Sequence, residues 1–244
     1  MQRNFWFFGL VATLLFLTTA GCDSQTVPTA PANPPASSPT NHAAASPTAG
    51  AESPDVVLFN GKDLTGWKET DFGGHGEVLV KDGIIEVSMG GQLTGFHWTN
   101  AAVLPKINYE IELDAMKRDG HDFFCGLTFP VNNSFCSLII GGWGGSVVGI
   151  SSLDGADASE NDTSTGLFFE RNRWHHIRLR VQSEKIMVWI DKDKVIDVGI
   201  AGRKISMRSG DIELSIPLGF ATWQTSASYR NLSLKKIPVE AAKP

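Results

Sequence analysis

The sequence predicts an all-β domain, built as a jelly-roll sandwich of two antiparallel sheets. Apolar and polar residues alternate along most of residues 55 to 238, and alternation with period two is typical of half-buried strands. The candidate strands are short, closely spaced and separated by Gly, Asn and Asp turns, as in sandwiches and barrels. No ten-residue stretch shows the apolar stripe of a helix. More than ten strands favour two large sheets over an immunoglobulin domain.

The N-terminus is typical of an export signal. Arg3 precedes an apolar run over residues 5 to 17, and small residues lead into Cys22. We expect residues 1 to 21 to be a lipoprotein signal peptide, with Cys22 lipidated after cleavage. Two alternatives stay open. Thr19 stands where such signals more often carry Leu, so ordinary secretory cleavage is one, and a transmembrane anchor is the other, although the apolar run is short for a bilayer.

Residues 22 to 54 are expected to form a disordered tether. They contain seven of the twelve prolines and no aromatic residue, so they cannot bury enough apolar surface to offset chain entropy. We expect the β-sandwich domain to follow over residues 55 to 238, with residues 239 to 244 as a disordered tail. This organisation predicts a location in a bacterial cell envelope, lipid-anchored to a membrane and facing the periplasm or the cell surface.

Composition limits the partners of the domain. The length of residues 55 to 238 suits one domain, and six of the seven tryptophans lie in it. A formal net charge of -5 without a Lys or Arg cluster argues against a nucleic acid as partner. No nucleophile motif, phosphate loop or zinc spacing is present, so we expect no cofactor. We expect a monomer that binds a small or neutral ligand.

Two hairpins can be assigned a register. Residues 78 to 87 turn at Asp82 and Gly83, a dipeptide that tolerates positive φ at both central positions. Residues 176 to 191 turn at Ser183 and Glu184. The second hairpin then pairs Ile177 with Ile190, Leu179 with Val188 and Val181 with Ile186 on its core side, and Arg180 with Met187 and Arg178 with Trp189 on the other. Arg178 is expected to stack on the Trp189 indole.

Further strands are expected from the same alternation. Their residue ranges are 56 to 59, 93 to 98, 107 to 117, 123 to 129, 135 to 140, 146 to 151, 167 to 170, 195 to 198, 212 to 215, 218 to 222 and 228 to 236.

Cys125 and Cys136 form a possible disulfide pair, since the expected compartment is oxidising. However, a loop over residues 130 to 134 would set Cys125 opposite Ile139, a register that strains a disulfide. Two buried thiols are the alternative.

The strand over residues 108 to 120 carries the first candidate functional residues. Glu110, Glu112 and Asp114 alternate along one of its faces. Three neighbouring carboxylates repel one another and would raise the pKa of at least one of them if a groove desolvated them. A general acid arises in this way. A solvated outer face is the alternative.

A polar cluster follows at the end of this strand. Arg118, His121 and Asp122 lie next to two phenylalanines in the sequence. A histidine beside a carboxylate can carry protons, because its pKa moves easily across neutral pH. A charged hairpin loop is the alternative.

Trp143 is the best candidate for a sugar platform. It lies in the sequence GGWGG, and glycines let a backbone approach a ligand closely. An indole can stack on the apolar face of a pyranose ring. Three further tryptophans are expected in the core, namely Trp67, Trp98 and Trp174, and Trp189 is expected to be covered by Arg178.

The acidic stretch LDGADASEND covers residues 153 to 162. Calcium prefers several carboxylate oxygens, but this spacing matches no calcium-loop signature. We therefore expect a solvated loop and assign no metal site, with bound calcium as the alternative.

Two parts of the sequence resemble one family. The stretch LFNGKDLTGW over residues 58 to 67 and the terminal strand GFATWQTSASYRNLSLKKI over residues 219 to 237 resemble the 3-keto-disaccharide hydrolase domain family. That family has the concanavalin A-like lectin/glucanase fold. The resemblance covers residues 55 to 237, while the middle, residues 119 to 146, departs from the commonest family pattern.

The resemblance implies hydrolysis of glycosides that carry a ketone at carbon 3. Such a reaction needs a base, a positive group near the ketone oxygen and an acid. As the base the candidates are Glu112, Asp114 and His121, and Arg118 is the candidate for enolate stabilisation. The substrate-binding candidates are Trp143, Asp122 and Glu110.

The sequence does not decide whether the domain is an enzyme. A two-carboxylate glycosidase is a second enzymatic alternative. A non-catalytic carbohydrate-binding module, or an envelope interaction module, needs no catalytic residue at all. In each carbohydrate alternative, the partner is a carbohydrate or glycoside.

Overall fold

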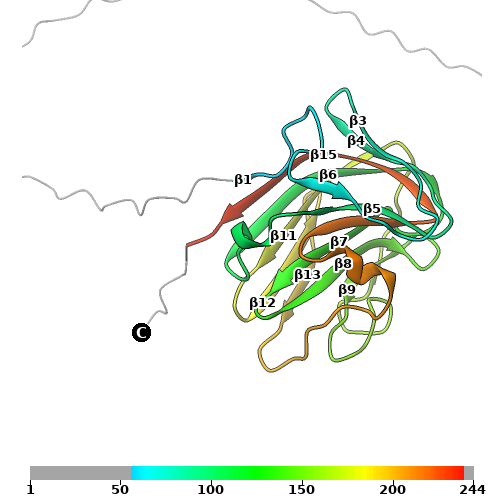
Figure 1. Cartoon of the computed structure of the whole chain (residues 1–244). Coiled ribbons are helices and arrows are strands. Elements are labelled where there is room, and N and C mark those ends of the chain that lie inside the picture. The colour runs from blue at the N-terminus through cyan, green and yellow to red at the C-terminus, as the bar shows by residue number, and fades with distance from the viewer. Residues whose placement is uncertain (1–55, 239–244) are drawn as a thin grey trace, which may run out of the picture. The chain divides into compact units, whose positions relative to one another are not determined.

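The computed structural model describes residues 56 to 238, and it confirms the predicted all-β sandwich (Figure 1). Two antiparallel sheets, of eight and seven strands, make up most of this range. Two short 3-10 helices, η1 (Ala101–Val103) and η2 (Asp211–Ser215), lie between strands. Within residues 56 to 238, no helix has the length and apolarity needed to cross a membrane. Cys22 and the predicted signal, tether and tail lie outside the described residues.

The eight-stranded sheet has the order β13-β12-β11-β6-β15-β4-β3, with β1 paired to β15. Its strands are β1 (Val56–Val57), β3 (Val78–Lys81), β4 (Ile84–Val87), β6 (Tyr109–Gly120), β11 (Trp174–Val181), β12 (Lys185–Ile190), β13 (Asp193–Gly199) and β15 (Thr225–Lys236).

The seven-stranded sheet has the order β10-β9-β8-β7-β14-β5-β2. Its strands are β2 (Trp67–Glu69), β5 (Leu93–Trp98), β7 (Cys125–Val131), β8 (Ser134–Gly142), β9 (Val147–Ser151), β10 (Thr165–Gly166) and β14 (Gly219–Trp223).

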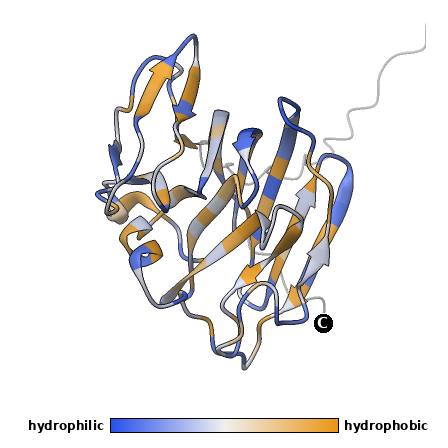
Figure 2. Ribbon diagram, turned by 90° about the vertical axis from the view of Figure 1, so that its right-hand side faces the viewer, coloured by the Kyte–Doolittle hydropathy of each residue, from blue (hydrophilic) through white to orange (hydrophobic). Residues whose placement is uncertain are grey.

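The core lies between the two sheets. Along the strands apolar and polar residues alternate (Figure 2), so each strand turns one face inward. On β6 the inward residues Ile111 and Leu113 have no exposed surface. Two inward tyrosines also connect the sheets, since Tyr109 donates a hydrogen bond to the Pro130 carbonyl and Tyr229 to the Phe124 carbonyl. The outward faces are therefore left for solvent or ligands.

Both predicted hairpins are confirmed. Strands β11 and β12 pair in the predicted register throughout, including Ile177 with Ile190 and Arg178 with Trp189. The guanidinium carbon of Arg178 lies 3.9 Å from the centre of the Trp189 ring. In the hairpin of β3 and β4, the turn residue Asp82 has φ of 51°.

Two predicted strands are wrong. Residues 212 to 215 lie in η2, and residues 167 to 170 form no strand. Phe169 is buried and Phe168 is 83% exposed, so the inward and outward alternation is real. Alternation does not show whether a neighbouring strand is available for pairing. Here pairing with β9 ends at Gly166, so the residues that follow form no strand.

The predicted register of the hairpin that contains the two cysteines is wrong by one residue. Cys125 lies opposite Ile140 and not Ile139, because the hairpin turns at Asn132 and Asn133 alone. Cys136 lies opposite Phe129, four residues further along the pair, and both cysteines are free and buried. Burial raises the pKa of the Cys136 thiol to about 12. The two thiols are therefore core residues, as the second alternative predicted.

The tryptophans divide between the core and the outer faces. Trp67 lies in the core as predicted, and its indole N–H donates to the Leu58 carbonyl at 2.6 Å. Trp98 is partly buried and packs against the core. The prediction for Trp174 is wrong, because it lies on the outer face of the eight-stranded sheet, with the Arg230 guanidinium 4.1 Å from the ring centre.

Candidate functional site

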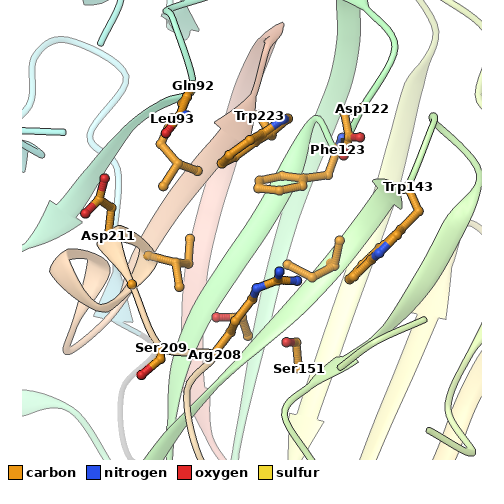
Figure 3. A pocket seen from close by; sticks show the side chains of 14 residues that line it. Gln92, Leu93, Asp122, Phe123, Trp143, Ser151, Arg208, Ser209, Asp211 and Trp223 are labelled. Carbon is orange, nitrogen blue, oxygen red and sulfur yellow. Dashed lines mark hydrogen bonds between the residues drawn. The ribbon is translucent and has the colours of Figure 1, made fainter. Parts of the chain in front are cut away.

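A cleft of about 450 Å³ lies on the outer face of the seven-stranded sheet (Figure 3). Strands β5, β8, β9 and β14 supply its floor, and the residues before η2 supply one rim. This volume falls within the range of about 300–1,000 Å³ for small-molecule sites. The cleft is lined by Gln92, Leu93, Asp122, Phe123, Ser137, Ile139, Trp143, Ser151, Arg208, Ser209, Gly210, Asp211, Ile212 and Trp223.

Aromatic side chains form part of the cleft wall. Phe123 and Trp223 are partly buried against a small apolar cluster that contains Leu93. Trp143 is 42% exposed on another side of the cleft. All three rings keep some exposed surface, and aromatic rings provide large apolar contact areas. The cleft can therefore accept the apolar face of a ring-shaped ligand.

The loop that carries Trp143 is held by Asp122. Residues 141 to 145 include Gly144, with φ of 87°, and Trp143 itself has φ of 48°. One carboxylate oxygen of Asp122 accepts from the Gly144 N–H at 3.2 Å, and the other accepts from the Phe123 N–H at 2.8 Å. The left-handed backbone explains the glycines around Trp143. Asp122 thus fixes the position of the Trp143 loop beside its own carboxylate.

Arg208 is the positive group of the cleft. Its Nη1 donates to Asp157 at 2.6 Å, and its side chain is still 57% exposed. In Figure 3 Arg208 stands at the lower side of the cleft near Ser151, with Asp211 to the left and Asp122 at the upper right. The remaining N–H groups of Arg208 make no other hydrogen bond with residues 56 to 238. A guanidinium in this state can donate to a ligand oxygen.

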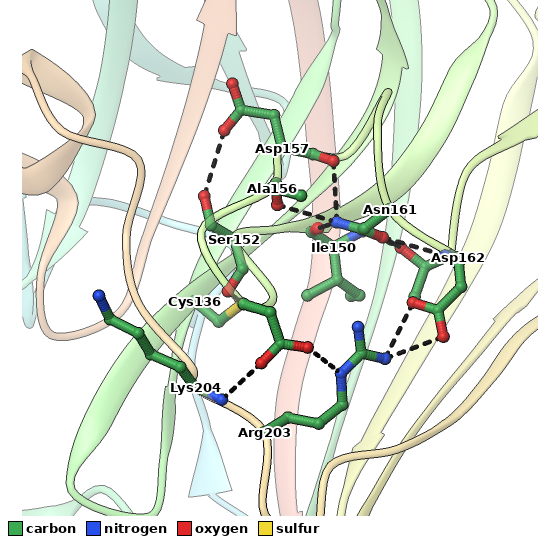
Figure 4. A network of polar contacts seen from close by, with 11 residues as sticks. Cys136, Ile150, Ser152, Ala156, Asp157, Asn161, Asp162, Arg203 and Lys204 are labelled. Atoms are coloured by element: carbon green, nitrogen blue, oxygen red, sulfur yellow. Dashed lines mark hydrogen bonds and ion pairs between the residues drawn. The ribbon is translucent and has the colours of Figure 1, made fainter.

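The acidic stretch over residues 153 to 162 binds two arginines, of which Figure 4 shows Arg203. Asp154 accepts from Arg203 Nε at 2.7 Å, and Asp162 accepts from Arg203 Nη1 at 2.9 Å. Asp157 contacts Arg208 in turn. Within residues 56 to 238, no group of three or more His, Cys, Asp or Glu side chains is arranged to hold a metal. The stretch is thus a structured loop that binds a neighbouring basic segment.

The predicted site residues divide between two faces. Asp122 and Trp143 line the cleft. His121 precedes Asp122 in an exposed bend and does not line the cleft. The other candidates lie on β6 of the eight-stranded sheet, on its outer face; they are Glu110, Glu112, Asp114 and Arg118. The structure therefore does not bring these β6 side chains together with Trp143.

Glu110 and Glu112 are neighbours on that outer face. Glu110 is 5% exposed, and it accepts from Arg180 Nε at 2.7 Å. Burial raises the pKa of Glu112, and the nearby Glu110 carboxyl raises it further. The rise expected for a row of carboxylates is therefore present, but it occurs outside the cleft.

Asp114 is engaged by three side chains. It accepts from Asn231 at 2.8 Å and from Arg230 at 3.1 Å, and it lies 3.0 Å from His176 Nδ1. Burial alone would raise the pKa of this carboxyl, but the three hydrogen bonds outweigh burial and hold the pKa below its usual value.

Arg208, Asp211 and Trp223 are cleft residues that the sequence analysis did not identify. The sequence does indicate the orientation of Trp223, because alternation along β14 turns Phe220 inward and Trp223 outward. Arg208 and Asp211 lie in a stretch without a period-two pattern. Only the pairing of that stretch with residues after β9 brings them to the cleft.

The fold and the cleft define a class: a β-sandwich domain with a ligand-sized cleft on one sheet. The particular family follows from the sequence. Residues 54 to 235 match the 3-keto-alpha-glucoside-1,2-lyase-like domain family, and the chain belongs to that family. This confirms the family resemblance predicted from the two ends of the domain. No curated protein sequence matches the chain.

Several solved structures are similar to the chain. A Crh5 transglycosylase in complex with NAG is 10% identical, with a TM-score of 0.50, and the match covers 78% of this chain and 86% of that one. The carbohydrate-binding module CBM66 from Bacillus subtilis is 15% identical, with a TM-score of 0.47 and coverage of 70% and 96%. Domain 4 of the GH43 arabinanase AbnA from Geobacillus stearothermophilus, in complex with arabinotriose, is 12% identical, with a TM-score of 0.45 and coverage of 70% and 82%. At such identities the similarity concerns the fold alone.

Proposed function

We propose that the cleft binds a glycoside and that Trp143 stacks on one of its sugar rings. The observation that carries this proposal is the convergence, in one cleft, of partly exposed aromatic side chains with Asp122, Arg208 and Asp211. Sugars combine apolar ring faces with hydroxyl edges, so a site for them needs both kinds of group. The β6 carboxylates are not needed for binding in the cleft.

We further propose that the bound ligand is a 3-keto glycoside and that the domain cleaves it by elimination. Membership of a family described as 3-keto-alpha-glucoside-1,2-lyase-like supports this reaction. A ketone at carbon 3 acidifies the hydrogen at carbon 2. Removing that proton gives an enolate, and breaking the bond from carbon 1 to the aglycone oxygen then gives a carbon 1–carbon 2 double bond and restores the ketone. The aglycone leaves with the electron pair and takes up a proton.

Two cleft residues suit the steps of this reaction. Asp122 is the proposed base, because its carboxylate is fixed by two backbone N–H groups beside the Trp143 platform. Arg208 is the proposed cation for the enolate oxygen, because its remaining donors are unused by residues 56 to 238. In this assignment Asp122 and Arg208 replace the β6 carboxylates and Arg118.

The test uses the whole protein and matched pairs of glycosides that differ only in the 3-keto group. Turnover is followed by release of the aglycone, and binding is followed by calorimetry. We expect turnover of the 3-keto member alone, with Trp143→Ala weakening the binding of that member. Trp189→Ala is the matched control, because Trp189 lies on the outer face of the other sheet.

Other outcomes separate the remaining alternatives. Binding of both glycosides without turnover would replace the enzyme with a carbohydrate-binding module. Failure to bind any member of a broad glycan panel would reject the proposal for the cleft and leave an envelope interaction role.

We also propose that the protein is anchored in a bacterial envelope by a lipid on Cys22. The sequence before the domain supports this, since Cys22 follows an apolar run and small residues. Metabolic labelling with a fatty acid should mark the intact protein and not the Cys22→Ser variant. An unlabelled protein in the soluble fraction would indicate ordinary secretory cleavage.

A further inference from the structure

We infer that Asp157 is a positioning residue for the cleft, because it holds the Arg208 guanidinium where a ligand oxygen can meet it. Asp157 does not line the cleft itself. Its Oδ2 accepts from Arg208 at 2.6 Å, and its Oδ1 accepts from Ser151 at 3.2 Å and from Ser152 at 3.1 Å. Both oxygens of this carboxylate therefore accept hydrogen bonds, and these bonds fix its orientation.

The backbone brings the two residues together from distant parts of the chain. Ser152 and Ser206 exchange two backbone hydrogen bonds, of 2.8 and 3.2 Å, and the Asp154 N–H donates to the Lys204 carbonyl at 2.8 Å. The segment before Arg208 therefore runs antiparallel to the residues after β9. This pairing places the base of the Arg208 side chain at the cleft, but it leaves the direction of the long side chain undetermined.

The contact with Asp157 determines that direction. A charge-assisted hydrogen bond is stronger and shorter than a neutral one. An arginine side chain that is largely exposed otherwise samples many rotamers, and ordering it when the ligand binds costs conformational entropy. Arg208 held in advance avoids that cost, and the guanidinium N–H groups that Asp157 leaves unused are available to a ligand. The exposed ion pair itself contributes little to the stability of the fold.

The same loop offers a matched control. Asp154 also binds an arginine, since it accepts from Arg203 Nε at 2.7 Å. Arg203 does not line the cleft. The variants Asp157→Asn and Asp154→Asn thus remove the same charge from one loop, and only the first releases a cleft residue.

The first measurement needs no ligand. The guanidinium N–H signals of Arg208 are followed by NMR in the whole protein, assigned with Arg208→Lys. We expect Asp157→Asn to broaden or remove these signals, while Asp154→Asn leaves them in place. Unchanged Arg208 signals in Asp157→Asn would overturn the inference, whether or not the protein acts on a glycoside.

The second measurement uses a 3-keto glycoside and rests on the proposed function. We expect Asp157→Asn to lower kcat/KM about tenfold, as one lost ligand contact does, and Asp154→Asn to leave it unchanged within about twofold. In a background of Arg208→Ala, adding Asp157→Asn should have no further effect, because a positioning residue acts only through its target. A full additional loss in that background would overturn the inference. A wild-type protein without turnover or binding would reject the proposed function, and the NMR result would still decide the role of Asp157.

Discussion

The two outer faces of the sandwich contain the same kinds of residue in opposite states. On the eight-stranded sheet, Trp189 is covered by Arg178 at 3.9 Å and Glu110 is bound by Arg180 at 2.7 Å. On the seven-stranded sheet, Trp143 has no cation over its ring among residues 56 to 238, and it is 42% exposed. The first face covers the ring of Trp189 and pairs Glu110, whereas the second leaves the Trp143 ring and part of the Arg208 guanidinium exposed to a ligand.

The contrast between the two faces indicates which residues of a β-sandwich are available to bind a ligand. Tryptophans, arginines and carboxylates attract attention in a sequence wherever they occur. Their availability depends on the partners that neighbouring strands provide. A paired group is part of the stability of the fold, and an unpaired group in a cleft is a candidate for binding.

The largest expected effect concerns Asp122. If this carboxylate is the base, Asp122→Asn should lower kcat for a 3-keto glycoside about a hundredfold or more, since general base catalysis contributes that much. Aglycone release at saturating substrate measures the change. Asp119→Asn is the control, because Asp119 is paired with Arg171 at 3.1 Å and does not line the cleft. Equal losses in both variants would show a general effect of charge near the loop.

The next effect is on stability and concerns the paired face. Arg180→Ala leaves the buried Glu110 carboxyl with only Arg178, at 3.9 Å. We expect the free energy of unfolding to fall by about 2–3 kcal/mol, because removing one partner of a buried pair leaves a charge uncompensated. Urea unfolding measures it, and Lys185→Ala, which breaks an exposed pair with Asp197, should cost less than about 1 kcal/mol.

Ligand binding should be the same in Arg180→Ala and in the wild type at a temperature where both are folded. A loss of binding in this variant would mean that the two faces are coupled, contrary to the comparison.

A smaller effect is expected for Trp143. Trp143→Ala should weaken glycoside binding by about 1.4 kcal/mol, or tenfold, because the ring supplies a central aromatic contact. Calorimetry measures the affinity. Trp189→Ala on the paired face should leave the affinity unchanged, and equal losses from both tryptophans would remove the distinction between the faces.

Local patterns in the sequence were enough for much of the fold. The register of the β11–β12 hairpin followed from facing apolar pairs such as Leu179 and Val188. The pattern failed at residues 212 to 215, where alternation is present but no strand forms. Alternation reports which side of the chain is apolar, and it does not report which strand edges are free.

The site was harder to predict than the fold. Trp143 and Asp122 could be selected, because a glycine-rich loop and a polar bend beside phenylalanines are visible in the sequence. Arg208 could not, since its place depends on backbone pairing between residues more than fifty positions apart. Alternation also placed the β6 carboxylates on an outer face correctly, but it does not distinguish one outer face of a sandwich from the other.

The smallest expected effect is a pH dependence on the paired face. Burial alone would raise the pKa of Asp114, but hydrogen bonds from His176, Asn231 and Arg230 hold it below its usual value. As the pH falls, the unfolded chain therefore binds this proton first. The contribution of Asp114 to stability is full above the unfolded pKa of about 3.9 and is lost as the pH falls through the lower folded pKa. Asp114→Asn should then flatten the acid side of the stability profile, measured by urea unfolding between about pH 5 and pH 2. A variant whose acid profile matched that of the wild type would show that the three hydrogen bonds do not favour the charged carboxylate. That result would contradict the view that this face stabilises its own charged groups.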